Sequence, residues 1–491
     1  MDRFYVTTPI YYVNDRPHIG HAYSTIAADV LARFWRLHLG EDKVWFLTGT
    51  DEHGGKIEQA AQKAGKSPQA FCDEISGQFK SAWEKLGLGF NDFIRTTEPR
   101  HEKAVTAFLL ALRDAKTPQG NSVVFEGEYS GLYCTGHEAF LKESDLVKGL
   151  CPDHKTKPEL IKEKNWFFKL SDFTPALTKL IESDKIEVAP VSRKHEVLSF
   201  LKQGLEDIAI SRPQVKWGIP LPYDTAQTIY VWVDALINYI SAVGYGDDRE
   251  LLARWWPADL HIIGKDIIKF HCVIWPALLM AVGLEPPRKI FAHGFFTVRG
   301  QKISKTIGNV VDPLDIASRY GSDALRYFLL REITFGEDGD FSEEKLKQVY
   351  NGELANMLGN YVSRITALGE KFGEINISNS SRFDEIVKNM PGEFIGHVKE
   401  LRFGKALDFL WNELKAHDKE IQDQALWHEK DKKVLQESLL HHAEFILWFN
   451  HLARSFLPET FERIRSKFIF DSANSILIMK KSNPIFPRVE S

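Results

Sequence analysis

Residues 4–21 read FYVTTPIYYVNDRPHIGH, and this stretch decides the fold. Its first part, residues 4–8, is rich in β-branched and aromatic side chains and stops at Pro9, as expected for a buried strand. Residues 20–39 then place apolar side chains at helical spacing until Gly40 ends the pattern. A strand that leads directly into a helix predicts the first βα unit of a parallel sheet.

The same alternation returns further along the chain. Residues 43–48, 259–264 and 289–294 each predict another strand of that sheet. Residues 117–200 interrupt the alternation and contain a hairpin-like segment at 127–133. We therefore expect an α/β fold, a split Rossmann-type parallel sheet with an inserted connective domain.

Beyond residue 342 the sequence is almost entirely helical in pattern, which predicts an α-helical bundle after the sheet domain. The expected domains are residues 1–116 (first half of the Rossmann domain), 117–200 (connective insertion), 201–299 (second half), 300–342 (a lysine-containing loop and a linking segment) and 343–491 (helical domain).

Composition narrows the class of protein. The 491 residues are 44% hydrophobic and 26% charged, which is typical of a chain with several globular domains. Apolar runs end well before the roughly 20 residues of a membrane-spanning helix, and the N-terminus lacks a targeting pattern, so we expect a cytoplasmic protein with no membrane contact. Four cysteines are too few for a disulfide framework. A net charge of −5 argues against coating nucleic acid but leaves local RNA recognition open.

Two histidines follow the first strand, in Pro17-His18-Ile19-Gly20-His21. At a helix N-terminus, backbone N–H groups and the helix dipole favour an anion such as phosphate. Gly20 has no Cβ, so a planar group such as adenine can approach the backbone closely. Two surface histidines near a helix start would give the same four residues, and that alternative stays open on this segment alone.

Two lysines lie three residues apart after the last predicted strand, in Gln301-Lys302-Ile303-Ser304-Lys305-Thr306. In a loop flanked by Gly300 and Gly308 they can close over a polyphosphate, although a solvated basic loop would look the same. The order of the two segments favours function, because both then meet at the carboxyl edge of one sheet.

In this order, His18-Ile19-Gly20-His21 and Lys302-Ile303-Ser304-Lys305-Thr306 resemble the HIGH and KMSKS signatures of class I aminoacyl-tRNA synthetases. Ile303 and Thr306 depart from the second signature, and both lysines are kept. Within this class the sequence is similar to the methionyl-tRNA synthetases over nearly its whole length. The segments that carry this similarity are residues 5–14, 48–54, 210–212, 230–235 and 263–267.

The resemblance implies an enzyme that activates L-methionine with ATP and Mg²⁺ to methionyl-adenylate. The methionyl group then passes to tRNA(Met), including the initiator tRNA. The implied catalytic residues are His18, His21, Lys302 and Lys305. The implied ATP-binding residues are His18, Gly20, His21, Gly264, Asp266, His293 and Lys305.

Methionine needs an apolar, aromatic slot for its thioether and a buried carboxylate for its ammonium group. By resemblance, Asp51 is that carboxylate and Arg212 helps to organise the charged end of the amino acid. The residues implied for the slot are Ile10, Tyr12, Trp232, Tyr239, Ile267, Phe270 and His271. For Ile267 and Phe270, packing in the core is an equal alternative.

Two further constellations concern metal and tRNA. Cys134-x-x-His137 and Cys151-x-x-His154 have the spacing of a zinc knuckle, either holding a structural Zn²⁺ or left as an empty remnant of such a site. The family's knuckle usually has more cysteines, and His137 stands in for one. Asn360 and Arg364 lie one helical turn apart, and the resemblance assigns that face to the tRNA anticodon, against the alternative of a surface pair.

Rival functions are less compatible with the sequence. Synthetases for isoleucine, valine and leucine carry a large editing insertion, and residues 117–200 are too few for one. Synthetases for cysteine bind the thiol of their substrate with an active-site zinc, whereas the candidate zinc ligands here lie together in the insertion. A non-catalytic paralogue would have no reason to keep both phosphate-binding segments. We expect a monomeric enzyme.

Overall fold

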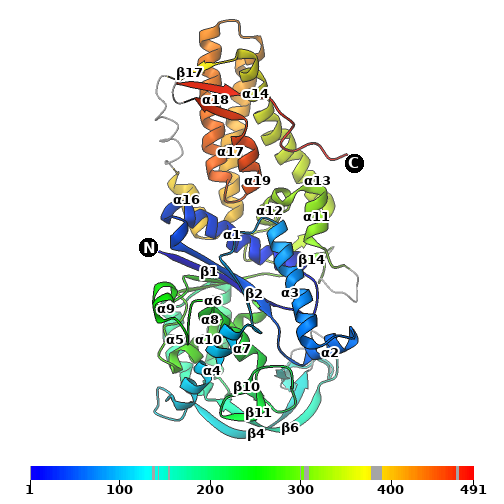
Figure 1. The fold of residues 1–491 in the computed structure, drawn as a ribbon, viewed down its shortest axis with the longest axis vertical. Helices are drawn as coiled ribbons and strands as arrows, with labels where there is room; N and C mark the ends of the chain where they lie inside the picture. The colour runs from blue at the N-terminus through cyan, green and yellow to red at the C-terminus, as the bar shows by residue number, and fades with distance from the viewer. Residues whose placement is uncertain are drawn as a thin grey trace. The chain divides into compact units, whose positions relative to one another are not determined.

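The computed structural model describes residues 2–134, 139–141, 143–152, 155–298, 300–302, 309–377, 390–471 and 475–490. Its contacts divide the chain into two compact units (Figure 1). The first unit comprises Met1–Pro17, Leu39–Ser81 and Phe90–His293, and the second comprises His18–His38, Ala82–Gly89 and Gly294–Ser491.

A six-stranded parallel sheet forms the centre of the first unit. Its strands, in spatial order, are β3 (Asp92–Arg95), β2 (Val44–Asp51), β1 (Phe4–Tyr12), β12 (Leu260–Gly264), β13 (Lys289–His293) and β7 (Glu187–Ala189). Strand β1 pairs in parallel with β2 on one side (Figure 1). On the other side it pairs in parallel with β12, which comes from a distant part of the sequence. The expected α/β fold with a split parallel sheet is confirmed.

Strand β7 departs from the sequence-based description. Residues 187–189 fall inside the stretch expected to be the connective insertion, yet they pair in parallel with β13 at the edge of the main sheet. A strand of three residues is too short to show a periodic pattern, which is why the sequence did not reveal it.

Helices and a second sheet complete the first unit. The helices are α2 (Gly55–Lys63), α3 (Pro68–Lys85, of which the residues from Ala82 onward are counted with the second unit), α4 (Pro99–Asp114), α5 (Thr174–Glu182), α6 (Val191–Lys202), α7 (Val231–Leu236), α8 (Asn238–Ser241), α9 (Arg249–Trp255) and α10 (Trp275–Ala281). The antiparallel sheet has the order β5 (Ala139–Leu141), β4 (Val124–Cys134), β6 (Glu159–Phe168) and β8 (Ile208–Ala209). A smaller sheet has the order β10 (Pro220–Leu221), β11 (Asp224–Ile229) and β9 (Ser211–Arg212).

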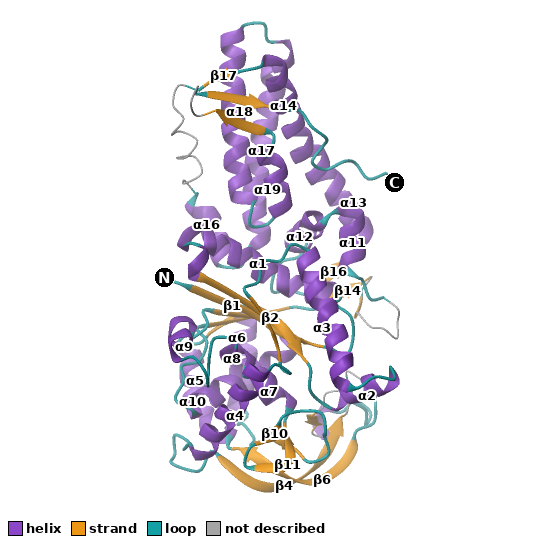
Figure 2. Cartoon of the chain, in the orientation of Figure 1, coloured by secondary structure: helices purple, strands orange, loops and turns teal. Residues whose placement is uncertain are grey.

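Helices dominate the second unit (Figure 2). They are α1 (Ile19–Leu39), α11 (Pro313–Tyr320), α12 (Ser322–Arg331), α13 (Glu343–Val349), α14 (Asn360–Phe372), α16 (Gly392–Lys399), α17 (Phe403–Gln424), α18 (Lys432–Ala453) and α19 (Pro458–Arg465). A π-helical segment, Tyr350–Gly359, joins α13 to α14. One short sheet is formed by β15 (Gln301–Lys302), β14 (Phe296–Val298) and β16 (Gly339–Phe341).

The helical pattern of the C-terminal part concealed a second short sheet in this unit. It contains β17 (Ile375–Asn376), β19 (Ile476–Met479) and β18 (Phe468–Asp471). Strand β19 reads Ile-Leu-Ile-Met, without the polar alternation that identifies a strand. Among the described helices of the chain, none has both the length and the apolar character required to span a bilayer.

A buried ion pair ties helices of the second unit together. Arg326 on α12 is fully buried and donates to Asp29 Oδ2 of α1 at 2.6 Å. The same guanidinium donates to the carbonyl oxygens of Phe456, at 2.9 Å, and Ser455, at 3.1 Å. Burial alone would raise the pKa of Asp29, but Arg326 and then Arg33 hold that pKa below its ordinary value. The arrangement therefore depends on both charges being present.

Replacing Asp29 with Ala should destabilise the protein by about 3–5 kcal/mol, because it leaves the Arg326 cation buried and unpaired. Urea unfolding followed by tryptophan fluorescence measures this. The matched control is Asp315→Ala, which removes a largely exposed partner of Arg319 and should cost about 0.2–1 kcal/mol. An Asp29→Ala effect as small as that of the control would contradict the prediction.

Candidate functional site

The carboxyl edge of the main sheet brings the first group of expected site residues together. Tyr12, at the end of β1, is the register partner of Asp51, at the end of β2. The backbone N–H of Val13 donates to the Asp51 carbonyl at 3.1 Å, and the Asp51 side chain is buried. A register shift between Thr7 and Ile10 bends β1 just before this edge. Open α/β sheets bind ligands at such an edge.

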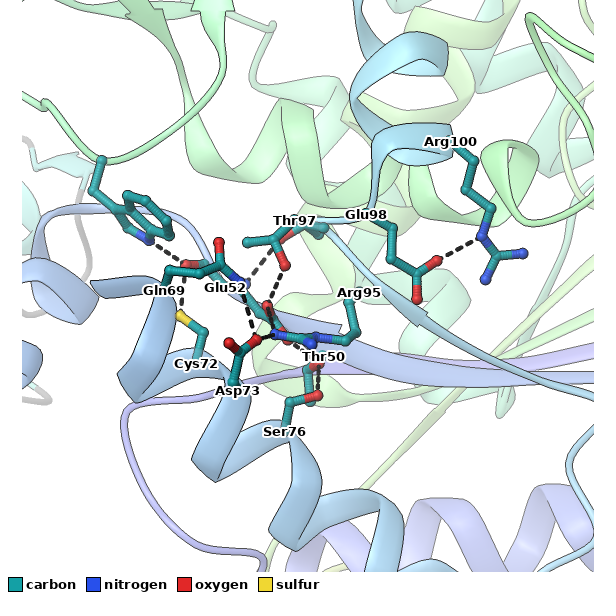
Figure 3. Close-up of polar contacts among 12 residues, drawn as sticks. Thr50, Glu52, Gln69, Cys72, Asp73, Ser76, Arg95, Thr97, Glu98 and Arg100 are labelled. Carbon is teal, nitrogen blue, oxygen red and sulfur yellow. Dashed lines mark hydrogen bonds and ion pairs between the residues drawn. The ribbon is translucent and has the colours of Figure 1, made fainter. Parts of the chain in front are cut away.

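Glu52, the residue after Asp51, is a fully buried carboxylate that the sequence analysis did not single out. Arg95 donates to both of its oxygens, at 2.7 and 2.9 Å, and the hydroxyls of Thr50 and Thr97 donate to it at 2.7 and 2.6 Å (Figure 3). The indole N–H of Trp217 donates to the Glu52 carbonyl at 2.6 Å. This network fixes the backbone that carries Asp51.

His53, the third residue of this segment, forms a buried chain with Asp234 and His101. Asp234 on α7 lies 2.7 Å from His53 Nδ1 and 2.8 Å from His101 Nε2 on α4, and His101 Nδ1 lies 2.8 Å from the Ser241 hydroxyl. Burial opposes the charge on Asp234, but His53 and His101 lower its pKa to about 2. Burial also opposes a charged His53, but Asp234 outweighs it and raises the pKa of His53.

The residues expected to line the thioether slot share one apolar core in the first unit. Trp232 stacks on Phe270, with ring centroids 4.0 Å apart and planes 12° from parallel. Tyr239 belongs to the core itself. The others are partly buried and pack against the same core: Ile10, Tyr12, Trp232, Ile267 and Phe270. Since all of them pack against one core, the structure gathers the apolar part of the expected slot.

The hydrogen bonds of His271 fix its protonation. Its Nδ1 lies 3.0 Å from the Ile267 carbonyl, so this nitrogen must carry the hydrogen. Its Nε2 therefore accepts from the Tyr239 hydroxyl, at 2.7 Å. Burial lowers the pKa of His271 to about 4, so the ring is neutral near pH 7. His261, which stacks on Tyr239 at 4.2 Å, is also buried, and burial and His271 lower its pKa well below the ordinary value.

Arg212 lies on β9 and is buried. Its guanidinium carbon is 4.0 Å from the centre of the Tyr230 ring, and it donates to the Ser211 carbonyl at 2.7 Å. A cavity beside it is lined by His53, Gly54, Tyr133, Arg212, Val215, Trp217, Ile229, Tyr230 and Val231. The expected arginine therefore lines the same cavity as the segment that follows Asp51.

The expected nucleotide-binding residues of the first unit lie at the ends of two adjacent strands. Gly264 on β12 is the register partner of His293 on β13. A Cβ at Gly264 would lie 2.5 Å from Asp266 Oδ1, so glycine lets this carboxylate lie against the strand end. The three residues therefore share the carboxyl edge of the sheet.

In the second unit, the side chains of His18 and His21 stack at the start of α1, with centroids 3.6 Å apart. His18 Nδ1 accepts from the Gly20 N–H at 3.1 Å, and His21 Nδ1 accepts from the His18 N–H at 3.3 Å. When Nδ1 accepts, the hydrogen of a neutral imidazole is on Nε2. Burial and His18 lower the pKa of His21 well below its ordinary value. His21 is therefore a neutral ring with an Nε2–H donor, and His18 has its hydrogen at the same position.

The backbone N–H groups at this helix start already have partners. The sequence analysis expected the N–H groups of the helix N-terminus to favour an anion such as phosphate. Instead they donate to protein: Ile19 to the Val311 carbonyl at 3.0 Å, Gly20 to the His18 ring and His21 to the His18 carbonyl at 3.0 Å. A Cβ at Gly20 would lie only 3.0 Å from the His18 ring. Glycine is thus needed here for the fold-back of His18.

The lysine loop begins at the short sheet of the second unit. Lys302 pairs with Thr297 across β15 and β14, whereas Lys305 lies outside the described residues. Asp340 holds this hairpin, since its Oδ1 accepts from the Gly300 N–H at 2.7 Å and from the Thr297 hydroxyl at 2.6 Å. The Ile19–Val311 hydrogen bond also joins the histidine segment to the chain just after the loop. The start of α1 therefore contacts the residues that follow the lysine loop in the sequence.

The expected anticodon residues both lie on α14. Asn360 is exposed at its start, and Arg364 forms an ion pair with Asp418 of α17 at 3.3 Å. The expected zinc ligands Cys134 and Cys151 are both buried, although they lie in a segment with many exposed residues. The chain turns tightly after the second, because the Cys151 N–H donates to the Thr156 carbonyl at 2.9 Å. His137 and His154 lie outside the described residues.

Comparison with known proteins begins with a family model described as tRNA synthetases class I (M), which matches residues 4–157 and 153–366. The matched residues include the histidine pair and the lysine segment, and the fold is that of a class I tRNA synthetase.

Individual relatives narrow this class. The methionine–tRNA ligase of Thermotoga maritima is 44% identical over 487 residues, which cover 96% of this chain and 76% of the relative. That of Rickettsia conorii is 47% identical over 375 residues, covering 76% and 72%. The structure of Mycobacterium tuberculosis methionyl-tRNA synthetase in complex with methionyl-adenylate matches with a TM-score of 0.91 and 37% identity, over 99% of this chain and 100% of that one. This chain belongs to the methionyl-tRNA synthetases, as its sequence motifs predicted.

Replacing Asp234 with Asn should destabilise the protein by about 1–3 kcal/mol, because it removes the charge that His53 and His101 face. Because folding raises the pKa of His53, its pairing with Asp234 makes the free energy of unfolding depend on pH. This contribution is complete below the pKa of about 6.5 in the unfolded chain, and it is lost as the pH rises through the higher pKa in the folded protein. The difference between parent and variant should therefore shrink from about pH 6 to about pH 9 in urea unfolding. A difference that stays constant or grows over this range would exclude this assignment, and the exposed His195→Gln serves as control.

Proposed function

We propose that this chain activates L-methionine with ATP through the candidate residues described above, and then transfers the methionyl group to tRNA(Met), including the initiator tRNA. The observation that carries the proposal is the placement of Asp51 at the same sheet edge as Tyr12, which packs against the core shared by the expected slot residues. The Mycobacterium tuberculosis relative binds methionyl-adenylate, the product that the first step would give.

Asp51 would accept the methionine ammonium group, and Arg212 would organise the charged end of the amino acid. The thioether would lie among Trp232, Phe270 and the other slot residues. A neutral His271, held by Tyr239, suits a thioether, because a cation there would have to be desolvated beside an apolar chain. The slot would then select methionine by its shape and polarisability.

The methionine carboxylate would attack the α-phosphorus of ATP, with pyrophosphate leaving. The Nε2–H groups of His18 and His21 would donate to phosphate oxygens, while Lys302 and Lys305 supply positive charge to the departing pyrophosphate. Gly264, Asp266 and His293 would hold the adenosine at the sheet edge. Neither step needs a dedicated protein base, so positioning and charge stabilisation carry the rate.

Metals and tRNA complete the proposal. Mg²⁺ would accompany ATP and neutralise phosphate charge. Cys134, His137, Cys151 and His154 would hold a structural Zn²⁺, and the burial of both sulfurs fits such a role, since four protein ligands would pin this segment. Asn360 and Arg364 would contact the anticodon, with Asp418 orienting the arginine. We further propose a monomer that works in the cytoplasm.

Methionine-dependent exchange of pyrophosphate into ATP tests the function directly. The protein should catalyse exchange with methionine and not with the other standard amino acids. Lys305→Ala should slow adenylate formation by about 10²–10³-fold with little change in methionine affinity, because its charge acts on the transferring phosphates. Lys179→Ala, an exposed lysine on α5, is the matched control. Equal losses in rate and methionine affinity would refute this role for Lys305.

The His21 ring offers a sharper test of the first step. Gln places its amide near the Nε2 position, whereas Asn places its amide near Nδ1. If Nε2–H donates to phosphate, His21→Asn should slow adenylate formation by about 10²–10³-fold, and His21→Gln should retain more of the rate. Single-turnover adenylate formation at saturating substrates gives both values. A faster Asn variant would mean that His21 acts mainly by accepting from the His18 backbone.

A further inference from the structure

Helices α17 and α18 bring three metal-binding side chains together in the helical part of the second unit. His417 and Glu420 lie three residues apart on α17, and His441 lies on α18. One ligand atom from each lies within 4.8 Å of those of the other two. The proposed zinc knuckle and the catalytic residues are different residues, so this cluster is unexplained by the proposed function.

The contacts of His417 prepare it to bind a metal. Its Nδ1 lies 3.0 Å from the Glu413 carbonyl, one turn earlier on α17, so Nδ1 must carry the hydrogen. In the neutral ring, the lone pair is then on Nε2. The ring also stacks on Phe445, with centroids 3.6 Å apart and planes 8° from parallel. A histidine whose second nitrogen donates to a carbonyl and whose ring is held by packing is the usual form of a metal ligand.

Glu420 and His441 already face each other across the two helices. His441 Nε2 lies 3.3 Å from Glu420 Oε2. Two ligands on one tetrahedral zinc ion, each about 2.0–2.1 Å from the metal, are about 3.3–3.4 Å apart. The pair therefore has the spacing of two metal ligands.

Two groups beside the cluster already have partners within the protein. His442 is buried, with Nδ1 2.9 Å from the Tyr361 hydroxyl. The cation of Arg364 is paired with Asp418, which lies between His417 and Glu420 in the sequence. The side chains of His441 and Glu420 are themselves 50% and 37% exposed, so an ion can reach them from solvent.

We propose that His417, Glu420 and His441 form a binding site for a divalent transition-metal ion such as Zn²⁺ or Co²⁺, which clips α17 to α18. Two imidazoles and one carboxylate suit these ions, whereas Mg²⁺ and Ca²⁺ prefer sites made only of oxygen ligands. Three protein ligands leave a fourth position for water or another small donor. The rings need only small side-chain rotations to converge, because their ligand atoms are already within 4.8 Å.

Cobalt titration of the metal-free full-length chain, followed by visible absorption, tests this site. His417→Ala, His441→Ala and Glu420→Gln should each weaken binding at this site by more than about tenfold, which is the cost of losing even a supporting partner of a metal ligand. Exposed His428→Ala, in the turn between the two helices, is the matched control and should bind as the parent does. Excess Mg²⁺ should not displace the cobalt.

Two features separate this site from the cysteine segment. Cobalt bound by histidine and carboxylate gives no sulfur charge-transfer band, and in a Cys134→Ser, Cys151→Ser background one equivalent of cobalt should still bind. That equivalent should disappear when His441→Ala is added. Zinc should also raise the thermal midpoint of the parent more than that of the His441→Ala variant. Unchanged cobalt binding and zinc stabilisation in all three ligand variants would overturn the proposal, as would displacement by Mg²⁺.

Discussion

The buried ion pair between Glu52 and Arg95 is the interaction on which the proposed methionine site depends. Glu52 is fully inaccessible to solvent, and an ion there is stable only because a bidentate guanidinium and two hydroxyls satisfy both of its oxygens. The carbonyl of Glu52 accepts a hydrogen bond from the indole N–H of Trp217, which lies between β9 and β10 in the sequence. Since Asp51 and His53 flank it, this one carboxylate fixes the backbone of the residues on both sides.

Three consecutive residues thus perform three different tasks. Asp51 lies at the sheet edge beside Tyr12, Glu52 anchors the backbone, and His53 connects through Asp234 to the helix that carries Trp232. Successive side chains at a strand end point to opposite faces of the sheet. Neighbouring residues can therefore contact different surroundings and take different roles. A change at Glu52 would therefore alter the proposed methionine pocket, although Glu52 is not proposed to contact methionine.

Sequence motifs identified the residues that would touch substrates, because those residues lie in short contiguous segments such as residues 18–21 and 51–53. The supporting partners were not recognised from sequence. Arg95, His101 and Asp340 are isolated polar residues in their own segments. The role of each depends on a contact with a residue far away in the sequence, which a local motif does not show. Strand β7 and the sheet of β17, β18 and β19 were missed because their strands are too short or too uniformly apolar to show a period. The sequence signal that could have identified such supporting residues is a polar residue within an otherwise apolar stretch, such as His261 in β12.

The histidine pair at the start of α1 provides neutral hydrogen-bond donors, whereas the proposed positive charge comes from a different segment of the chain. The first three backbone N–H groups of α1 are used within the protein, and the two imidazole rings place Nε2–H donors at the helix start instead. Because His21 is neutral, its ring can donate a hydrogen bond without the desolvation cost of a buried cation. In the proposed mechanism, positive charge would come from lysines in a separate segment. Fixed neutral donors would then orient ATP, and the lysines would stabilise the charge on the leaving phosphates.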